Sequence, residues 1–378
     1  MNILILSNHL KIGGITQYII SLARALSARK IRVIVASGGG EMERELSKGP
    51  ARHVEVDLRT KCECGPKVFR AIPRLARLVR EEKIDLIHAH TRVTQVVSAV
   101  VSAMTRVPYI STCHGFFRPR IGRRLCGCWG SKVIAISGPV AKHLTDDFHI
   151  KTEDIALIHT GVDSGRFAAV FSEEELNGLR SSLRLRKAPV VGTIGRFSPV
   201  KGHRFFIEAF RKVVAERPDA QGIIVGQGPE EEDLRQLIRR YNLGGSFRLA
   251  GSTPHTAMYL ALLDIFVFPS VQEGLGLSLL EAMASGRPCV ASRIGGVSDI
   301  IRDGETGLLV PAQDPDALGG AMIRLLGDPL LGRKLGENAR RSVARDFSLE
   351  TMVEKVLRLY NEVVDSHRTK KAGPRIRG

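Results

Sequence analysis

The sequence predicts an α/β protein that consists of two domains, each with a parallel sheet flanked by helices. The chain has 378 residues, about twice the length of a common single domain. Short apolar runs alternate with longer runs of helical period throughout, which is typical of parallel sheets. This alternation restarts after the polar, irregular residues 161–187, so two domains are expected.

The predicted elements divide the chain near residue 165. We expect a first domain at residues 1–165, a second at residues 166–347, a helix at residues 348–366 and a basic tail at residues 367–378. The predicted strands cover residues 2–7, 32–37, 84–88, 109–112, 132–136, 156–159, 190–194, 221–225, 247–249, 265–268 and 288–291. The predicted helices include residues 16–29, 93–104, 173–183, 203–217, 229–241, 278–285 and 296–301. Two open α/β domains in tandem place the carboxyl ends of their strands beside a cleft, so functional residues should directly follow strands.

The composition indicates a folded cytoplasmic protein. Hydrophobic residues make up 43% and charged residues 25%, which are ordinary values for a globular chain. The first ten residues, MNILILSNHL, are typical of a buried strand and lack the basic region of a signal peptide. The apolar residues 93–104 are too few to span a bilayer. The close cysteine pairs have CxC spacing, unlike common zinc sites, and are interpreted as reduced thiols.

The net charge of +17 lies mainly in the first domain and the tail. Residues 1–165 contain 25 Lys and Arg against 14 Asp and Glu, whereas residues 166–378 contain 31 against 25. Five basic residues lie in the tail, namely Arg368, Lys370, Lys371, Arg375 and Arg377. Such a distribution favours an anionic membrane surface, at about 1 kcal/mol per basic side chain, and a peripheral location on the inner face of the plasma membrane. Nucleic acid is not expected, because no nucleic-acid motif is present and the charge is scattered over predicted helices.

Residues 66–83 predict an amphipathic helix with two open interpretations. Its apolar side chains either enter a membrane surface or pack on the sheet as in an ordinary outer helix. Pro73 is expected to kink or start this helix. The apolar face contains Val68, Ile72, Leu75 and Val79, and beside it lie Lys67, Arg70, Arg74 and Arg77. A separate basic stretch, which we interpret as an acceptor-side or membrane-side patch, contains Arg118, Arg120, Arg123 and Arg124.

Residues 268–286 form the segment most indicative of chemistry. A strand is followed by a loop with Glu273 and by a helix whose first turns contain Glu281. Glycines let the backbone approach a ligand, and free amides at a helix start favour phosphate. The two glutamates are eight positions apart, which in a helix would be about 12 Å of rise and somewhat more with a loop portion, a reach that suits two hydroxyl-rich ends of one ligand. The alternative is that Glu273 is a solvated loop residue and that Glu281 is a helix-end charge that complements the helix dipole. The candidate backbone contacts are Gly274, Leu275, Gly276 and Leu277.

Two further loops after predicted strands are candidates for phosphate binding. Arg196 and Lys201 follow the strand at residues 190–194, and their cations suit a departing diphosphate. Gly13 and Gly14 follow the first strand and open a helix, where backbone amides favour an anion. The alternatives are a solvated basic loop and a plain tight turn. The dinucleotide fingerprint GxGxxG with its acidic partner is absent from the Gly13 loop.

Other residues at predicted strand ends are His114, Gly226 and Gly228. His114 is expected to bond a donor-sugar hydroxyl or to stabilise charge near the anomeric carbon, with a structural histidine as the alternative. The two glycines would bring the backbone near a nucleotide, with a plain strand-to-helix turn as the alternative.

At these residues the sequence resembles family 4 of the retaining glycosyltransferases. The glutamates at 273 and 281, with seven residues between them, are the most specific match. The matching elements occur in the expected order over nearly the whole chain, at residues 13–14, 114, 161–163, 195–196, 201–202, 226–228, 273–281, 295–296 and 303–310.

The resemblance implies the GT-B fold, with two Rossmann-like domains facing an interdomain cleft, and a last helix that returns to the first domain. The first domain would bind the acceptor and the second a UDP-, GDP- or ADP-sugar. By the resemblance, Arg196 and Lys201 would hold the diphosphate, Glu281 the ribose and Glu273 the sugar. His114 would lie beside the sugar ring, and Gly14 with the amides of residues 275–277 would complete the phosphate site.

The predicted function is therefore retaining sugar transfer from a nucleotide-diphosphate sugar to a glycan or lipid-linked acceptor, in cell-envelope polysaccharide, lipopolysaccharide or glycolipid synthesis. No cofactor and no metal are expected, because no cluster of Asp or His at ligand spacing is evident. Another GT-B activity, such as a sugar phosphorylase or a nucleotide-sugar epimerase, is the alternative, since fold does not fix function.

Overall fold

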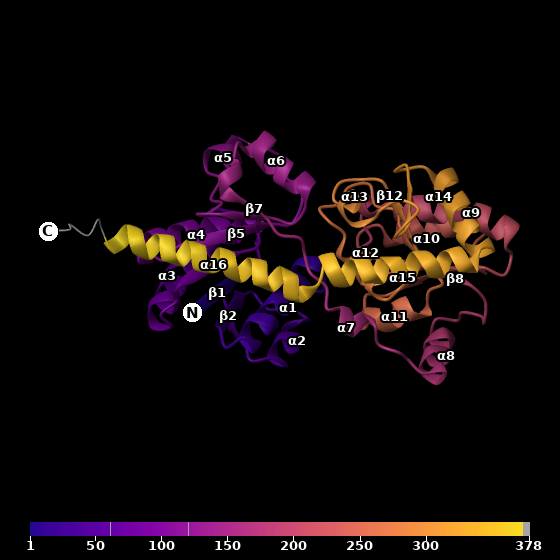
Figure 1. The fold of residues 1–378 in the computed structure, drawn as a ribbon, viewed down its shortest axis with the longest axis horizontal. Helices are drawn as coiled ribbons and strands as arrows, with labels where there is room; N and C mark the ends of the chain where they lie inside the picture. The colour runs from indigo at the N-terminus through magenta and orange to yellow at the C-terminus, as the bar shows by residue number, and fades with distance from the viewer. Residues whose placement is uncertain (61, 120, 373–378) are drawn as a thin grey trace. The chain divides into compact units, whose positions relative to one another are not determined.

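The computed structural model describes residues 1–60, 62–119 and 121–372, which form two compact units (Figure 1). The first unit comprises Met1–Gly161 and Leu349–Gly378, and the second comprises Val162–Ser348. The chain therefore leaves the first unit after Gly161 and returns to it after Ser348. Three residues of the predicted basic stretches, Arg120, Arg375 and Arg377, lie outside the described residues.

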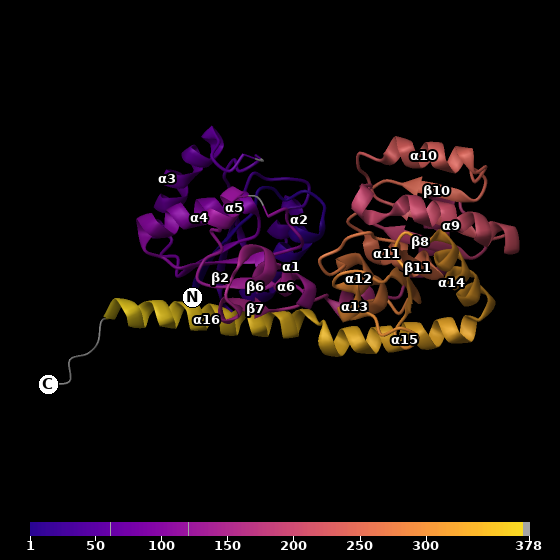
Figure 2. The ribbon, with the colours of Figure 1, turned by 90° about the horizontal axis from the view of Figure 1, so that it is seen from above.

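The first unit contains a seven-stranded parallel sheet in the order β3-β2-β1-β4-β5-β6-β7. Apolar side chains of α1 (Gly14–Ala28) and α16 (Leu349–Ala372) pack on one face. Helices α3 (Pro66–Glu81) and α4 (Arg92–Thr105) lie on the other face (Figure 2). Their apolar side chains pack there in a second core. The strands are β1 (Asn2–Leu6), β2 (Arg32–Ser37), β3 (Arg52–Glu55), β4 (Leu86–Ala89), β5 (Tyr109–Cys113), β6 (Val133–Ala135) and β7 (Ile155–Leu157).

The second unit contains a six-stranded parallel sheet in the order β10-β9-β8-β11-β12-β13. One face packs against α9 (His203–Glu216), α10 (Glu231–Arg240) and α14 (Pro315–Gly327). Both sheets are buried between helix layers, so the fold is the doubly wound α/β arrangement that the sequence predicts. The strands are β8 (Val190–Ile194), β9 (Gln221–Val225), β10 (Phe247–Ala250), β11 (Ile265–Phe268), β12 (Cys289–Ser292) and β13 (Leu308–Val310).

The remaining helices lie in the connections between strands or follow the last strand. In the first unit they are α2 (Glu43–Ser47), α5 (Ile121–Leu125), α6 (Gly138–Phe148) and η1 (Thr152–Asp154). In the second unit they are α7 (Ser164–Phe167), α8 (Glu173–Ser182), η2 (Pro199–Lys201), α11 (Thr256–Leu262), α12 (Leu277–Ala284), α13 (Val297–Ile300) and α15 (Pro329–Asp346).

The structure adds two strands that the sequence pattern does not predict. β3 has the sequence RHVE and is partly exposed along its length, so it lacks a continuous apolar run. β13 consists of the three residues Leu308–Val310. Both are edge strands of their sheets. The pattern misses β3 because it lacks an apolar run, and β13 because three residues are too few to show one.

Helix α3 packs its apolar face inside the protein. Val68, Leu75 and Val79 are buried in the core that α3 shares with α4, and Ile72 packs against the same core. The interpretation that this face enters a membrane is therefore wrong, because no side of it is free. Pro73 lies inside the continuous helix and does not start it. Within the described ranges, no helix is long and apolar enough to cross a membrane.

Candidate functional site

The strand order of each sheet reverses beside its first strand. In the first unit this point lies between β1 and β4, and in the second unit between β8 and β11. Loops at such a reversal diverge to opposite faces of the sheet, which leaves room for a ligand at the carboxyl ends of the strands. The candidate residues from the sequence follow β1, β5, β8, β9 and β11, and the segments after β8 and β11 meet at the reversal of the second sheet.

Lys201 and Glu273 form an ion pair across this reversal. The Lys201 ammonium donates to the Glu273 carboxylate, and both side chains are mostly shielded, with 25% and 18% of their surface exposed. The loop after β11 is fixed on η2, because the backbone amide of Val271 donates to the Val200 carbonyl at 2.8 Å. The sequence predicts that these two side chains bind different parts of one ligand, the diphosphate and the sugar, and the structure brings them into direct contact.

Arg196 lies in the same loop with its side chain exposed. It has no ion-pair partner among the residues that the structure describes, so its guanidinium is available to an anion. His203, the first residue of α9, lies 3.0 Å from the Arg196 carbonyl through its Nε2. Because a carbonyl only accepts, Nε2 carries the hydrogen, and burial lowers the pKa of His203 to about 4. His203 thus fixes the backbone at Arg196, a role that the sequence does not reveal.

The start of α12 offers free backbone amides beside the ion pair. Gly276 precedes the helix in a left-handed conformation, with φ of 108°, and none of the described side chains caps the helix. A Cβ at Gly276 would lie 3.1 Å from the Phe268 ring, so a larger residue would disturb both the turn and its packing. The amides of Leu279 and Leu280 donate to the Gly276 carbonyl, so those of Leu277 and Ser278 are the ones that favour an anion such as a phosphate.

Glu281 lies on the inner side of α12 and is 7% exposed. Burial raises the pKa of its carboxyl group to about 7, and Arg166 in α7 lowers it in part. The structure gives this carboxylate no hydrogen bond within the described ranges. A buried, unpaired carboxylate is costly to keep unless a ligand bonds to it. Glu281 is therefore the residue of this segment whose environment most strongly indicates ligand binding.

Gly226 and Gly228 hold two loops in close contact. A Cβ at Gly226 would lie 2.0 Å from the Gly195 carbonyl oxygen, and one at Gly228 would lie 2.2 Å from that of Phe197. Only glycine fits these positions. Their direct role is to pack the loop after β9 against the Arg196 loop. Gly13 and Gly14 differ, because both are exposed at the start of α1, and Gly13 has open space where a Cβ would lie.

His114 belongs to a cluster of histidines in the first unit. It follows β5, and its Nε2 lies 3.0 Å from Nδ1 of His90, which follows β4. The Tyr18 ring contacts His114 edge-on at 5.0 Å between centroids. Burial lowers the pKa of His114 to about 3, so the ring is neutral at ordinary pH. The sequence singles out His114 alone, although the segment His88-Ala-His90 is visible in it.

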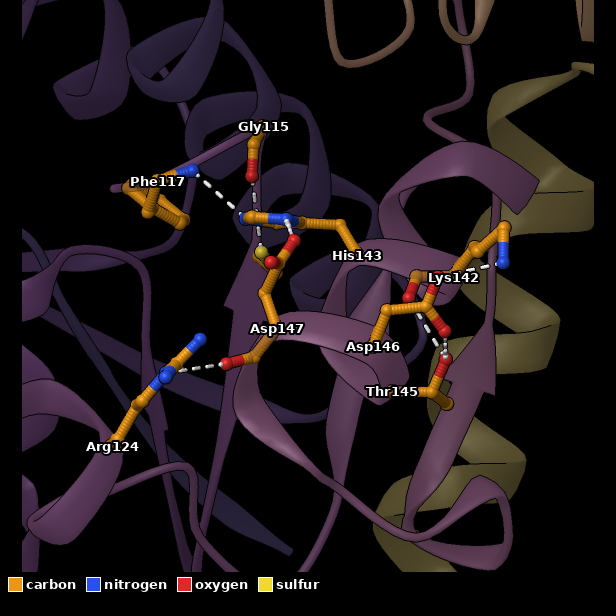
Figure 3. A network of polar contacts seen from close by, with 9 residues as sticks. Gly115, Phe117, Arg124, Lys142, His143, Thr145, Asp146 and Asp147 are labelled. Carbon is orange, nitrogen blue, oxygen red and sulfur yellow. Dashed lines mark hydrogen bonds and ion pairs between the residues drawn. The ribbon is translucent and has the colours of Figure 1, made fainter. Parts of the chain in front are cut away.

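Another histidine, His143 in α6, fixes the loop after His114 (Figure 3). The backbone amide of Phe117 donates to Nε2 of His143 at 2.9 Å. Nδ1 of His143 must then carry the hydrogen, and it lies 2.6 Å from the Asp147 carboxylate. Helix α6 thus anchors the loop by its side chains. No group of three or more His, Cys, Asp or Glu suited to a metal ion occurs among the described parts of the chain.

Two family models match the chain. Residues 12–166 match Glycosyltransferase Family 4, and residues 188–328 match Glycosyl transferases group 1. N-acetyl-alpha-D-glucosaminyl L-malate synthase of Bacillus anthracis is 27% identical over 77% of this chain and 78% of its own length. UDP-Gal:alpha-D-GlcNAc-diphosphoundecaprenol alpha-1,3-galactosyltransferase of Escherichia coli is 26% identical over 79% and 80%.

Solved structures share the fold. The Anabaena protein HepE, crystallised with UDP and glucose, has a TM-score of 0.83 at 23% identity, with 96% of this chain and 100% of HepE covered. The two parallel-sheet units are those of the GT-B fold, as predicted. The matched models lie one in each half of the chain, and the Escherichia coli relative is named a galactosyltransferase. The chain therefore belongs to glycosyltransferase family 4 and is a glycosyltransferase.

Proposed function

We propose that this glycosyltransferase moves a sugar, with retention of configuration, from a UDP-, GDP- or ADP-sugar to an acceptor hydroxyl in envelope polysaccharide, lipopolysaccharide or glycolipid synthesis. The observation that carries the donor assignment is the Lys201–Glu273 ion pair, which lies at the strand reversal of the second unit. Glu273 lies in the loop between β11 and α12, and among the described residues no side chain caps the start of α12. A cation and free amides beside a carboxylate suit a diphosphate that bears a sugar.

In this proposal Arg196 and Lys201 bind the diphosphate, and the backbone of residues 274–277 binds it at the start of α12. Glu281 accepts hydrogen bonds from the ribose hydroxyls, which gives its buried carboxylate the partners that the protein does not supply. Glu273 accepts hydrogen bonds from the transferred sugar. Gly226 and Gly228 act by holding the Arg196 loop in place, and Gly13 and Gly14 offer amides in the first unit.

The chemical step that these groups favour is substitution on one face of the sugar. The diphosphate leaves with the electrons of its bond to the anomeric carbon, and its oxygen accepts the proton of the acceptor hydroxyl as the new bond forms on the same face. Arg196 and Lys201 stabilise the charge that develops on the leaving group, at roughly 3 to 4 kcal/mol for a well-placed donor. His114 contacts the sugar ring. We expect no divalent ion to take part.

The acceptor is proposed to be a glycan or a lipid-linked glycan. The Escherichia coli relative is named for a diphosphoundecaprenol-linked acceptor, and the Bacillus anthracis relative for L-malate. An acceptor of the first kind lies at a membrane surface.

The outer face of α3 supports a membrane-surface location. Arg70, Arg74 and Arg77 are exposed and have no ion-pair partner among the described residues, and Phe69 among them is 64% exposed. Exposed basic side chains on a helix that also exposes an aromatic ring suit anionic headgroups and the interface below them. These residues lie on the side of α3 opposite its buried apolar face, the face for which the sequence leaves membrane contact open.

Vesicle flotation tests this surface. Replacing Arg70, Arg74 and Arg77 together by alanine should weaken binding to phosphatidylglycerol vesicles roughly 100-fold, at about 1 kcal/mol each. Replacing Arg235 and Arg239 is the control, because both are paired with glutamates on α10. Equal binding to phosphatidylcholine vesicles, or no effect of the triple variant, would contradict the location.

The proposed reaction is tested with a panel of nucleotide sugars and acceptors. We expect release of nucleoside diphosphate only when an acceptor is present, and a product whose anomeric proton shows the configuration of the donor. Sugar phosphate formed from inorganic phosphate would indicate a phosphorylase instead. Conversion of the donor without acceptor would indicate an epimerase.

A further inference from the structure

His90 has an unusual environment in the first unit. The ring is 2% exposed, and its Nδ1 lies 3.0 Å from Nε2 of His114. Its own Nε2 is buried and has no hydrogen-bond partner among the residues that the structure describes. The His88 ring lies against it, with centroids 4.1 Å apart, and Tyr18 contacts it at 5.4 Å. The backbone amide of His90 donates to Thr94 Oγ1. The ring is therefore held on several sides, and within the described part of the chain its one polar contact is His114.

The His90–His114 contact needs one hydrogen between two nitrogens. If His114 donated, Nδ1 of His90 would be the acceptor and its Nε2 would be a buried N–H without an acceptor. If His90 donates, its Nε2 is a bare nitrogen facing neighbouring rings. Orphaned buried N–H groups are rarer in proteins than under-satisfied acceptors. The second arrangement is thus favoured, and it leaves the hydrogen of His114 on Nδ1.

We propose that His90 is a positioning residue that holds His114 in the tautomer with its hydrogen on Nδ1. His114 is partly exposed, and the described residues give its Nδ1 no hydrogen-bond partner. In this tautomer it presents an N–H donor, which suits a hydroxyl oxygen of the transferred sugar. The functional part of this inference rests on the proposed role of His114 in sugar transfer. The tautomer itself does not.

The neighbouring His88 fixes the base of the cluster. Its Nδ1 lies 2.7 Å from the Tyr360 hydroxyl of α16, and its Nε2 lies 2.7 Å from Thr112 Oγ1. Burial lowers the pKa of His88 to about 3, so no second charge forms beside His90. The three rings are therefore neutral, and the direction of their hydrogen bonds decides which nitrogen of each ring carries the hydrogen.

The test uses ¹⁵N-labelled histidine in the full-length protein. Long-range proton–nitrogen spectra distinguish protonated from bare ring nitrogens, with His114→Asn for assignment. We expect His114 to carry its hydrogen on Nδ1, and His90→Phe, which keeps a ring but no hydrogen bond, to shift this signal toward a mixture of tautomers. His90→Asn should restore it, because the asparagine amide can donate from the position of Nδ1.

Kinetics complete the test. His90→Phe should lower kcat roughly 10- to 100-fold with little change in the donor KM, and His90→Asn should recover most of the loss. His53→Phe is the control, because His53 bonds Ser37 and Glu43 outside the cluster. A hydrogen on Nε2 of His114, or unchanged spectra in His90→Phe, would overturn the proposal. If no transfer is found in the unaltered protein, the proposed function fails while the spectra still decide the tautomer.

Discussion

Lys201 donates a hydrogen bond to the Glu273 carboxylate and joins the loops that follow β8 and β11. These residues lie 72 positions apart in the chain and meet because β8 and β11 are neighbours in the sheet. Their charges compensate each other in a partly buried place. A bound diphosphate would share the ammonium and leave the carboxylate for hydroxyl groups. Binding of the diphosphate by Lys201 would therefore be coupled to binding of the sugar hydroxyls by Glu273.

Lys201→Ala should lower kcat by about 10² to 10³, because it removes one donor from the leaving group and leaves the Glu273 carboxylate uncompensated. Steady-state transfer rates measure this effect. Lys212→Ala is the matched control, since that lysine forms an exposed ion pair with Asp316 at 2.7 Å. Full activity of Lys201→Ala would refute the assigned role.

Glu281→Gln should stabilise the protein and weaken donor binding. The raised pKa means that the native state binds a proton more tightly than the unfolded chain, so stability falls as pH rises from about 4.5 to 7. Glutamine removes this loss, and the gain in unfolding free energy should be about 1–3 kcal/mol larger at pH 8 than at pH 5. Denaturant titrations at both pH values test the sign. A gain that is larger at pH 5 would show that the carboxylate is stabilised by its surroundings.

Donor affinity should also depend on this carboxyl group. A charged acceptor bonds the ribose more strongly than a neutral one. The donor Kd should therefore rise as pH falls below 7 in the unaltered protein, and this dependence should flatten in Glu281→Gln. Calorimetry with an intact nucleotide sugar avoids titration of a terminal phosphate. An equally steep profile in the variant would assign the dependence to another group.

Gly226→Ala should destabilise the second unit by about 1–3 kcal/mol and weaken donor binding. The new Cβ would meet the Gly195 carbonyl oxygen at 2.0 Å and displace the loop that contains Arg196 and Lys201. Gly320→Ala in α14 is the control, because no atom lies within 4 Å of its Cβ position. It should stabilise the protein by about 0.5–1 kcal/mol. Thermal unfolding with and without donor separates the two effects.

Transfer should proceed in the presence of a chelator. The proposed site neutralises the diphosphate with Arg196, Lys201 and backbone amides, so a divalent ion would repeat their role. Rates measured with excess EDTA should match those measured with magnesium. Loss of transfer in EDTA that magnesium restores would place a metal ion in the reaction.

The sequence predicts the central strands best. The predicted residues 32–37, 190–194, 221–225 and 265–268 coincide with β2, β8, β9 and β11. Buried parallel strands are apolar on both faces and read as continuous runs, whereas the edge strand β3 lacks such a run and the edge strand β13 has only three residues. Helix α3 shows the limit of amphipathic patterns, because the same stripe of apolar residues suits a membrane or a core.

The site could be predicted only as separate segments. Glycines and charged residues after strands are visible in the sequence, but the sheet order that brings Lys201 to Glu273 is not. The contact of His203 with the Arg196 carbonyl depends on the start of α9, and the contact of His90 with His114 depends on β4 lying beside β5. Long-range contacts of this kind are set by topology, which a local pattern does not specify.

The central claim is that the second unit binds the donor through Arg196, Lys201 and Glu281. Calorimetry tests this claim most directly, by measuring the Kd of the nucleoside diphosphate that transfer releases from the preferred nucleotide sugar. We predict that Arg196→Ala and Lys201→Ala each raise Kd by roughly 10- to 100-fold, in line with 1.5–3 kcal/mol for a charged hydrogen bond, and that Glu281→Gln raises it less. Unchanged affinity in all three variants would contradict the account.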